Sequence, residues 1–191
     1  MTVTYTVEDI MSEGLCEEYT VEKVEELLAG RESISPRQIA ELNIPILDRI
    51  WILGRLLYRL SQWRAHRITR LIALDVADLW PCPNIAWWYL VSGDKNSRYA
   101  AWDASWNAAS VFHRSVALAA RSAAASVFLS RGAAREAADG NSRAAPSAAC
   151  DKARDDATWN AARDASWSAR DGKDAALERY LGWIIRFGWE V

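Results

Sequence analysis

The spacing of apolar residues along the chain predicts helices almost throughout. The first residues alternate apolar and polar side chains at Val3, Tyr5 and Val7, which indicates either one short strand or an extended arm. The segment 21–29 then repeats apolar residues at intervals of three and four, and Gly30 can end this helix. After residue 10 we expect no strand.

Start and stop signals predict two further elements before residue 80. Ser35-Pro36-Arg37-Gln38 combines an N-cap serine, a proline at the first helical position and a glutamine that can complete a capping box, so a short helix should cover 36–42. Pro45 opens the next helical pattern, which runs to Trp80 either as one long helix or as two helices joined near Ser61-Gln62.

The next stretch predicts one short helix and a loop. Pro81 and Pro83 end the preceding pattern, because proline cannot donate the backbone hydrogen bond that a helix interior needs. Asn84 can cap a helix over 85–90, and the polar residues 92–96 read as a loop.

From residue 97 onward alanine dominates, and alanine is the strongest helix former. We expect long helices over 98–131 and 147–171, a polar loop around 139–141, and a last helix over 174–187. Alanine recurs every fourth residue from Ala145 to Ala169, which is the spacing of the ridges that mesh in close helix packing. Four residues turn a helix by about 400°, so this row should meet more than one neighbour.

Together these elements predict an all-α fold, an Ala-rich helical bundle with two long helices and several shorter N-terminal helices. The chain of 191 residues is 51% hydrophobic and 25% charged, which excludes wholesale disorder, and no apolar run is long enough to span a membrane. We expect an N-terminal helical region over 1–96 and an Ala/Trp-rich bundle over 97–191, integrated into one domain.

Charge is unevenly distributed, although the net charge is only −2. Residues 1–30 carry eight acids and one base, whereas residues 31–100 carry six acids and ten bases. The acidic segment either faces a partner or neutralises the basic middle of its own fold. No region has the one-sided basic excess typical of nucleic-acid binding. The acidic start does not resemble a signal peptide, and three widely spaced cysteines do not form a disulfide framework, so we expect a cytoplasmic protein.

Three helix faces mix tryptophan with basic or polar residues and are candidate ligand-binding surfaces. Indoles can stack on a planar ligand while guanidinium groups bind phosphates; the alternatives are that the tryptophans fill the core and the arginines reach solvent. The candidates are Arg55, Arg59, Trp63, His66 and Arg70, which share the first face if the helix after Pro45 is continuous, Trp102, Trp106 and His113 on the second face, and Trp159, Arg163, Trp167 and Arg170 on the third.

No segment carries a catalytic or cofactor motif. Neither histidine has partners at metal-ligand spacing, and no glycine-rich phosphate loop or nucleophile elbow is present. Asp155 and Asp156 are adjacent, so on a helix they point about 100° apart and do not share a site. We therefore expect a non-enzyme with no catalytic residues, metal or cofactor.

Two segments in the second half, AAWDASWNAAS and ATWNAARDASWSAR, echo each other in a frame of alanine, serine, aspartate and asparagine. They resemble Ala/Trp/Arg-rich helical phage proteins and are similar to Ala-rich putative immunity proteins of bacterial toxin systems. The stretch ESISPRQIAELNIPILDRIWIL resembles a helical lead-in of some of those phage proteins. The resemblance implies a viral or mobile-element protein that acts by binding, with counter-defence as the common role.

The sequence thus leads to one main hypothesis and two alternatives. The main hypothesis is a non-catalytic phage counter-defence factor that sequesters a small anionic nucleotide signal. The alternatives are a protein–protein inhibitor or immunity-like protein that binds a host defence effector or toxin, and a structural virion protein. Eleven tryptophans and the alanine ridges exceed what one small core needs, so we also expect a homo-oligomer.

Overall fold

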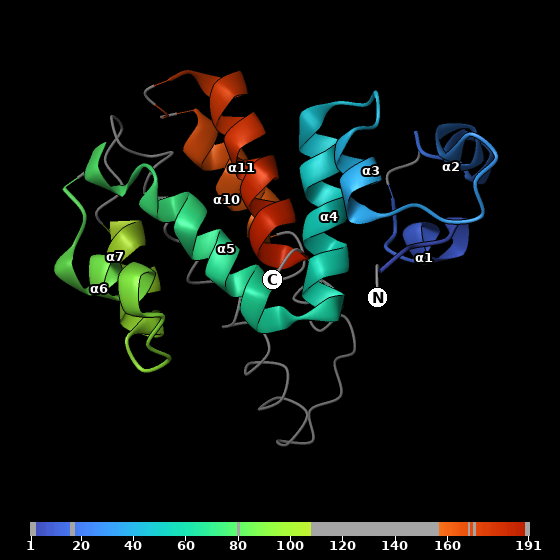
Figure 1. The fold of residues 1–191 in the computed structure, drawn as a ribbon. Helices are drawn as coiled ribbons and strands as arrows, with labels where there is room; N and C mark the ends of the chain where they lie inside the picture. The colour runs from blue at the N-terminus through green and yellow to red at the C-terminus, as the bar shows by residue number, and fades with distance from the viewer. Residues whose placement is uncertain are drawn as a thin grey trace, which may run out of the picture.

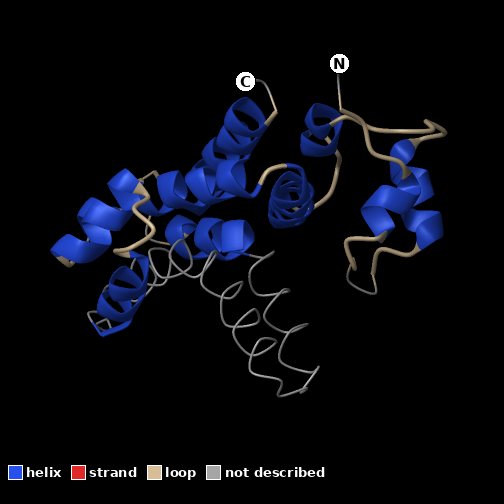
Figure 2. Cartoon of the chain, turned by 90° about the horizontal axis from the view of Figure 1, so that it is seen from below, coloured by secondary structure: helices blue, strands red, loops and turns tan. Residues whose placement is uncertain are grey.

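The fold is all-α, as the hydrophobic pattern predicts. The computed structural model describes residues 3–15, 18–79, 81–107, 157–167, 169 and 171–189. Within these ranges the regular elements are α-helices and one short 3-10 helix, with no strand (Figure 2). No helix in this part of the chain is long and apolar enough to cross a bilayer.

Three short helices at the N-terminus form a layer beside α4 (Figure 1): α1 (Val7–Met11), α2 (Val21–Leu28) and α3 (Pro36–Ala40). The extended start of the chain pairs with the segment before α3 at one antiparallel bridge, where the backbone groups of Tyr5 and Ile34 bond reciprocally at 2.9 Å. The N-terminal stretch is therefore an arm and not a strand of a sheet. The predicted capping box of Ser35 and Gln38 is present at the start of α3.

The pattern that starts at Pro45 folds as two helices, α4 (Ile46–Leu60) and α5 (Gln62–Leu74), and a 3-10 turn over Ala77–Leu79 follows. They are separated by Ser61, whose backbone is extended at φ −161° and ψ 94°. Of the two alternatives that the sequence leaves open, two helices joined near Ser61-Gln62 is therefore the one confirmed. It redirects the chain, so side chains before and after residue 61 no longer share one face.

Helices α6 (Asn84–Ser92) and α7 (Arg98–Asn107) form a hairpin at one end of the molecule (Figure 1). Asn84 is the first helical residue rather than the predicted cap. Gly93 ends α6 in the left-handed conformation, at φ +68°. The predicted helix over 98–131 is described only as far as Asn107, and its remainder, like the predicted loop at 139–141, lies outside the described residues.

The chain is described again at α10 (Ala157–Ser166) and α11 (Lys173–Gly188). The last helix matches its prediction within one residue at each end. The predicted helix over 147–171 lies outside the described residues before Ala157. It is wrong at its C-terminal end, because α10 stops at Ser166, whose hydroxyl donates to the Arg163 carbonyl at 2.8 Å. The following turn is held toward α11 by an ion pair between Asp171 and Arg179.

The core lies where α4, α5, α10 and α11 pack together, and small residues let the helices approach closely. A Cβ placed on Gly54 of α4 would lie 3.2 Å from the Cβ of Thr158 on α10. The hydroxyls of Thr158 and Thr69 of α5 are 3.0 Å apart and buried. Ala161 and Ala165 are fully buried, which confirms that this part of the alanine row is a helix–helix contact. As predicted, α10 meets more than one neighbour, since it packs on α4, α5 and α11.

One polar residue of α10 is buried. Its place among alanines suggests that Asp164 faces solvent, but the residue is only 8% exposed. Its carboxylate accepts from Nε and Nη2 of Arg163 at 3.0 and 2.9 Å. Burial raises the pKa of Asp164, and the hydrogen bonds and charge of Arg163 offset part of that increase. The buried face of α10 is therefore wider than the row of alanines alone.

Candidate ligand pocket

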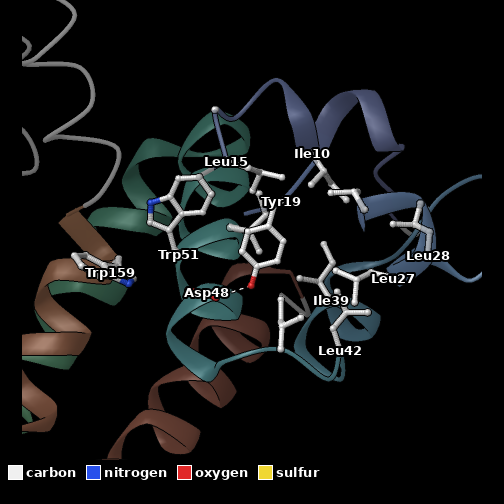
Figure 3. Close-up of a pocket in the computed structure, with 14 residues that line it drawn as sticks. Ile10, Leu15, Tyr19, Leu27, Leu28, Ile39, Leu42, Asp48, Trp51 and Trp159 are labelled. Carbon is white, nitrogen blue, oxygen red and sulfur yellow. Dashed lines mark hydrogen bonds between the residues drawn. The ribbon is translucent and has the colours of Figure 1, made fainter. Parts of the chain in front are cut away.

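An apolar pocket of about 500 Å³ lies among the helices of the N-terminal layer and α4 (Figure 3). Its walls come from α1, α2, α3, α4 and the connections between them, and α10 contributes one side chain at the edge. Most of the lining is aliphatic: Ile10, Leu15, Val24, Leu27, Leu28, Ile39, Leu42, Ile44 and Ile52, with Gly14, Tyr19, Asp48, Trp51 and Trp159 completing it. The volume lies in the range of sites for drug-sized ligands.

The pocket forms because α2 is amphipathic and stands against α1. Val24 and Leu28 of α2 turn inward and are buried, and Leu27 is half-buried. α3 packs directly on α4, whereas the main helix contact of α2 is with α1. The space between α2 and α4 is therefore bounded by apolar side chains without being filled by them.

One polar pair interrupts the apolar wall. The hydroxyl of Tyr19 donates to Oδ2 of Asp48 at 2.5 Å (Figure 3). Asp48 lies in the first turn of α4, where a carboxylate also interacts favourably with the helix dipole. The pocket thus offers a ligand one hydroxyl–carboxylate pair to orient it, within a wall that otherwise favours hydrocarbon.

Two tryptophans line the pocket on the side toward α10, and each has a guanidinium over its ring. Arg55 lies 5.1 Å from the ring of Trp51, and Arg163 lies 4.6 Å from the ring of Trp159. Both distances are within the range of cation–π contacts, so the aromatic side of the pocket has cations of the chain itself beside its rings.

The basic face predicted over 55–70 does not exist as one surface, because Ser61 breaks the helix. Its first two members, Arg55 and Arg59, form ion pairs with the acidic N-terminal segment. Glu13, only 4% exposed, accepts from Arg55 at 3.3 Å and from Arg59 at 2.6 Å. The hydrogen bond and charge of Glu13 raise the pKa of Arg59. Of the two roles predicted for the acidic segment, neutralising the basic middle of the fold is therefore present at this contact.

The remaining members of that face lie on α5, away from the pocket. Trp63 is exposed, and His66 lies 5.7 Å from the ring of Tyr58. The Nη1 of Arg70 donates to the carbonyl of Leu90 at 3.2 Å, at the C-terminal end of α6. Burial lowers the pKa of Arg70, which fits a side chain that packs between two helices.

The second predicted face is only partly described. Trp102 is half-buried against the core, and its ring is 6.2 Å from that of Tyr99. Trp106 belongs to the last turn of α7, and its side chain lies outside the described part of the structure. His113 also lies outside the described residues, so the face as a whole stays a prediction.

The third predicted face separates into different environments. Trp159 and Arg163 contact each other at the pocket edge, whereas Trp167 follows α10, is 66% exposed and has the Lys173 amine 4.5 Å from its ring. Arg163 has an acidic partner that a search at three- and four-residue spacing misses, because Asp164 is its immediate neighbour. Arg170 lies outside the described residues.

Among the predicted candidates whose side chains the structure describes, only Trp159 lines the pocket. The missed residues have a local signal on α4, since Asp48, Trp51 and Ile52 follow the spacing of one helix face. The rest of the lining consists of aliphatic residues of short helices, which sequence alone does not distinguish from core.

The described residues contain no group of three or more histidine, cysteine, aspartate or glutamate side chains that could hold a metal ion. Cys82, a free thiol, is half-buried, and burial raises its pKa to about 11, so it is a poor nucleophile at neutral pH.

No family model matches the chain, and neither the curated proteins nor the solved structures include a significant match to it. The resemblance to phage and immunity proteins therefore stays a prediction.

Proposed function

We propose that this protein is a non-catalytic binding protein whose site is the pocket between the N-terminal layer and α4. Its ligand is a small, mostly apolar molecule with one hydrogen-bonding group. The observation that carries the proposal is a pocket of about 500 Å³ whose described lining is almost entirely aliphatic and aromatic, with one polar pair, Tyr19 and Asp48. Convergent apolar walls with few polar groups are typical of small-molecule sites.

The contacts favour this ligand class over the nucleotide suggested by the mixture of tryptophan and arginine. A nucleotide needs cations for its phosphates, and the described candidates already make contacts within the chain. Arg55 and Arg59 bind Glu13, Arg70 binds backbone carbonyls, and Arg163 binds Asp164. Among the described lining residues the only carboxylate is that of Asp48, which would repel a phosphate.

The proposal is tested by titration with N-phenyl-1-naphthylamine, a neutral aromatic probe with one N–H donor that fluoresces in apolar surroundings. We expect binding below about 10 μM, equivalent to roughly −7 kcal/mol. Leu27→Trp should fill the pocket and weaken binding at least about tenfold. The matched control is Leu60→Trp, the same substitution at an exposed position at the end of α4, which should bind as the original protein does.

Two results would contradict the proposal. The first is absence of probe binding below about 10 μM; the second is equal binding by the Leu27→Trp variant. Calorimetry with cyclic nucleotides and ADP-ribose provides the contrasting arm. A nucleotide that binds at micromolar concentration and is insensitive to Leu27→Trp would support the phosphate-binding hypothesis instead. The role of the protein in phage counter-defence or immunity stays a prediction.

A further inference from the structure

The outer face of α6 exposes more large apolar side chains than a solvated helix normally does. This helix, Asn84–Ser92, contains no charged residue. Trp88 is 57% exposed and Val91 is 55% exposed, with Trp87 at 45% and Ile85 at 36% beside them. Asn84 and Ser92 are the polar residues on this face.

The opposite face of the same helix is also apolar. Ala86, Tyr89 and Leu90 are buried against the rest of the molecule. A helix that is apolar on all sides is usually enclosed on all sides. One half of α6 is enclosed by its own chain, and the other half meets solvent.

We propose that the outer face of α6 is the contact surface of a twofold-symmetric dimer of this chain. From typical side-chain areas, the four apolar residues expose on the order of 450 Å² per protomer. Two copies would bury about 900 Å² through them alone, close to the roughly 1,000 Å² that a specific interface needs.

The lack of charge on α6 favours a second copy of this chain as the partner that covers its outer face. In a twofold interface the same patch serves both subunits, so a residue near the axis meets its own counterpart. A charged residue there would face the same charge, whereas the uncharged face of α6 is compatible with itself. A membrane surface is the less favoured partner, because helices that lie on membranes carry lysine or arginine beside their apolar face, and α6 has neither.

Sedimentation of the full chain between 1 and 100 μM tests the proposal, with a dimer of twice 21.4 kDa as the expected species. Trp88→Glu should raise the dimer dissociation constant at least about 30-fold, as loss of a central tryptophan does at other interfaces. Trp63→Glu is the matched control, because Trp63 is 61% exposed on α5, and this variant should remain dimeric. Val91→Glu gives a second disruption if Trp88→Glu does not fold.

Hydrogen exchange of the unaltered protein supplies a readout that needs no variant. Protection of the α6 amides should fall when the protein is diluted below its dissociation constant, while that of the α4 amides stays constant. A monomer throughout the concentration range overturns the proposal, whether or not the protein then sediments with phosphatidylcholine–phosphatidylglycerol vesicles. A dimer that Trp88→Glu and Val91→Glu leave intact, or whose α6 protection does not depend on concentration, places the interface elsewhere and also overturns it.

Discussion

Replacement of Ala161 by leucine tests the close packing of the central helices. Ala161 is fully buried on α10, which packs on α4, α5 and α11. One turn earlier, Thr158 is so close to α4 that a Cβ on Gly54 would lie 3.2 Å from its own Cβ. Leucine adds three carbons at a point where the backbones are already near each other.

The expected cost follows from this geometry. Overpacking of a well-packed core typically destabilises a protein by about 1–3 kcal/mol. The tight approach at Gly54 leaves little room for relaxation, so we expect the upper part of that range, about 2–3 kcal/mol. For a chain of this size each kcal/mol lowers the melting temperature by roughly 2–4 °C, so Ala161→Leu should lower it by about 4–12 °C.

Thermal unfolding followed by circular dichroism measures the effect, and Ala175→Leu is the matched control. Ala175 lies on the exposed side of α11, so the same substitution there should change the free energy of unfolding by less than about 0.5 kcal/mol. If Ala161→Leu melts with the original protein, or if both variants lose the same stability, the close contact of α10 with its neighbours does not exist as described.

Two further predictions concern buried charges. Glu13→Gln removes the negative charge that pairs with Arg55 and Arg59, and should cost about 1–3 kcal/mol in urea unfolding; Glu8→Gln, at an exposed position, should cost almost nothing, and equal effects would show that the buried pair adds no stability. Burial raises the pKa of Asp164 above its ordinary 3.8, so the stability linked to its protonation is present below that value and is lost as pH rises through the raised pKa. Asp164→Asn should therefore melt above the original protein at pH 7 and with it below pH 3.8, and a difference that does not vary with pH would contradict the assignment.

The sequence predicted those parts of the fold whose signals are local. The capping box at Ser35 and Gln38, the break near Ser61 and the last helix all depend on residues within a few positions of one another. The same kind of signal was present at Thr6 and Asp9, which form the capping box of α1. The alternation of Val3, Tyr5 and Val7 instead favours a strand or an extended arm, so this pattern does not predict α1.

The candidate site depends on contacts that no local pattern encodes. The pairs that Glu13 makes with Arg55 and Arg59 join residues 42 and 46 positions apart. Helical periodicity places both arginines on one face, but it gives no information about which segment covers that face. Likewise, the apolar stripe of α2 predicts burial and does not distinguish a filled core from a cavity.

The contact between Arg70 and Gly93 has a consequence for how related sequences should vary. A Cβ at Gly93 would lie 2.5 Å from the Arg70 guanidinium, and the backbone there has a positive φ. A side chain at 93 would therefore displace the arginine that binds the last carbonyls of α6. Across related sequences the two positions should therefore covary, with glycine at 93 wherever position 70 is arginine. Where a shorter residue replaces Arg70, the clash is removed but the positive φ at 93 remains, so glycine should still be favoured there.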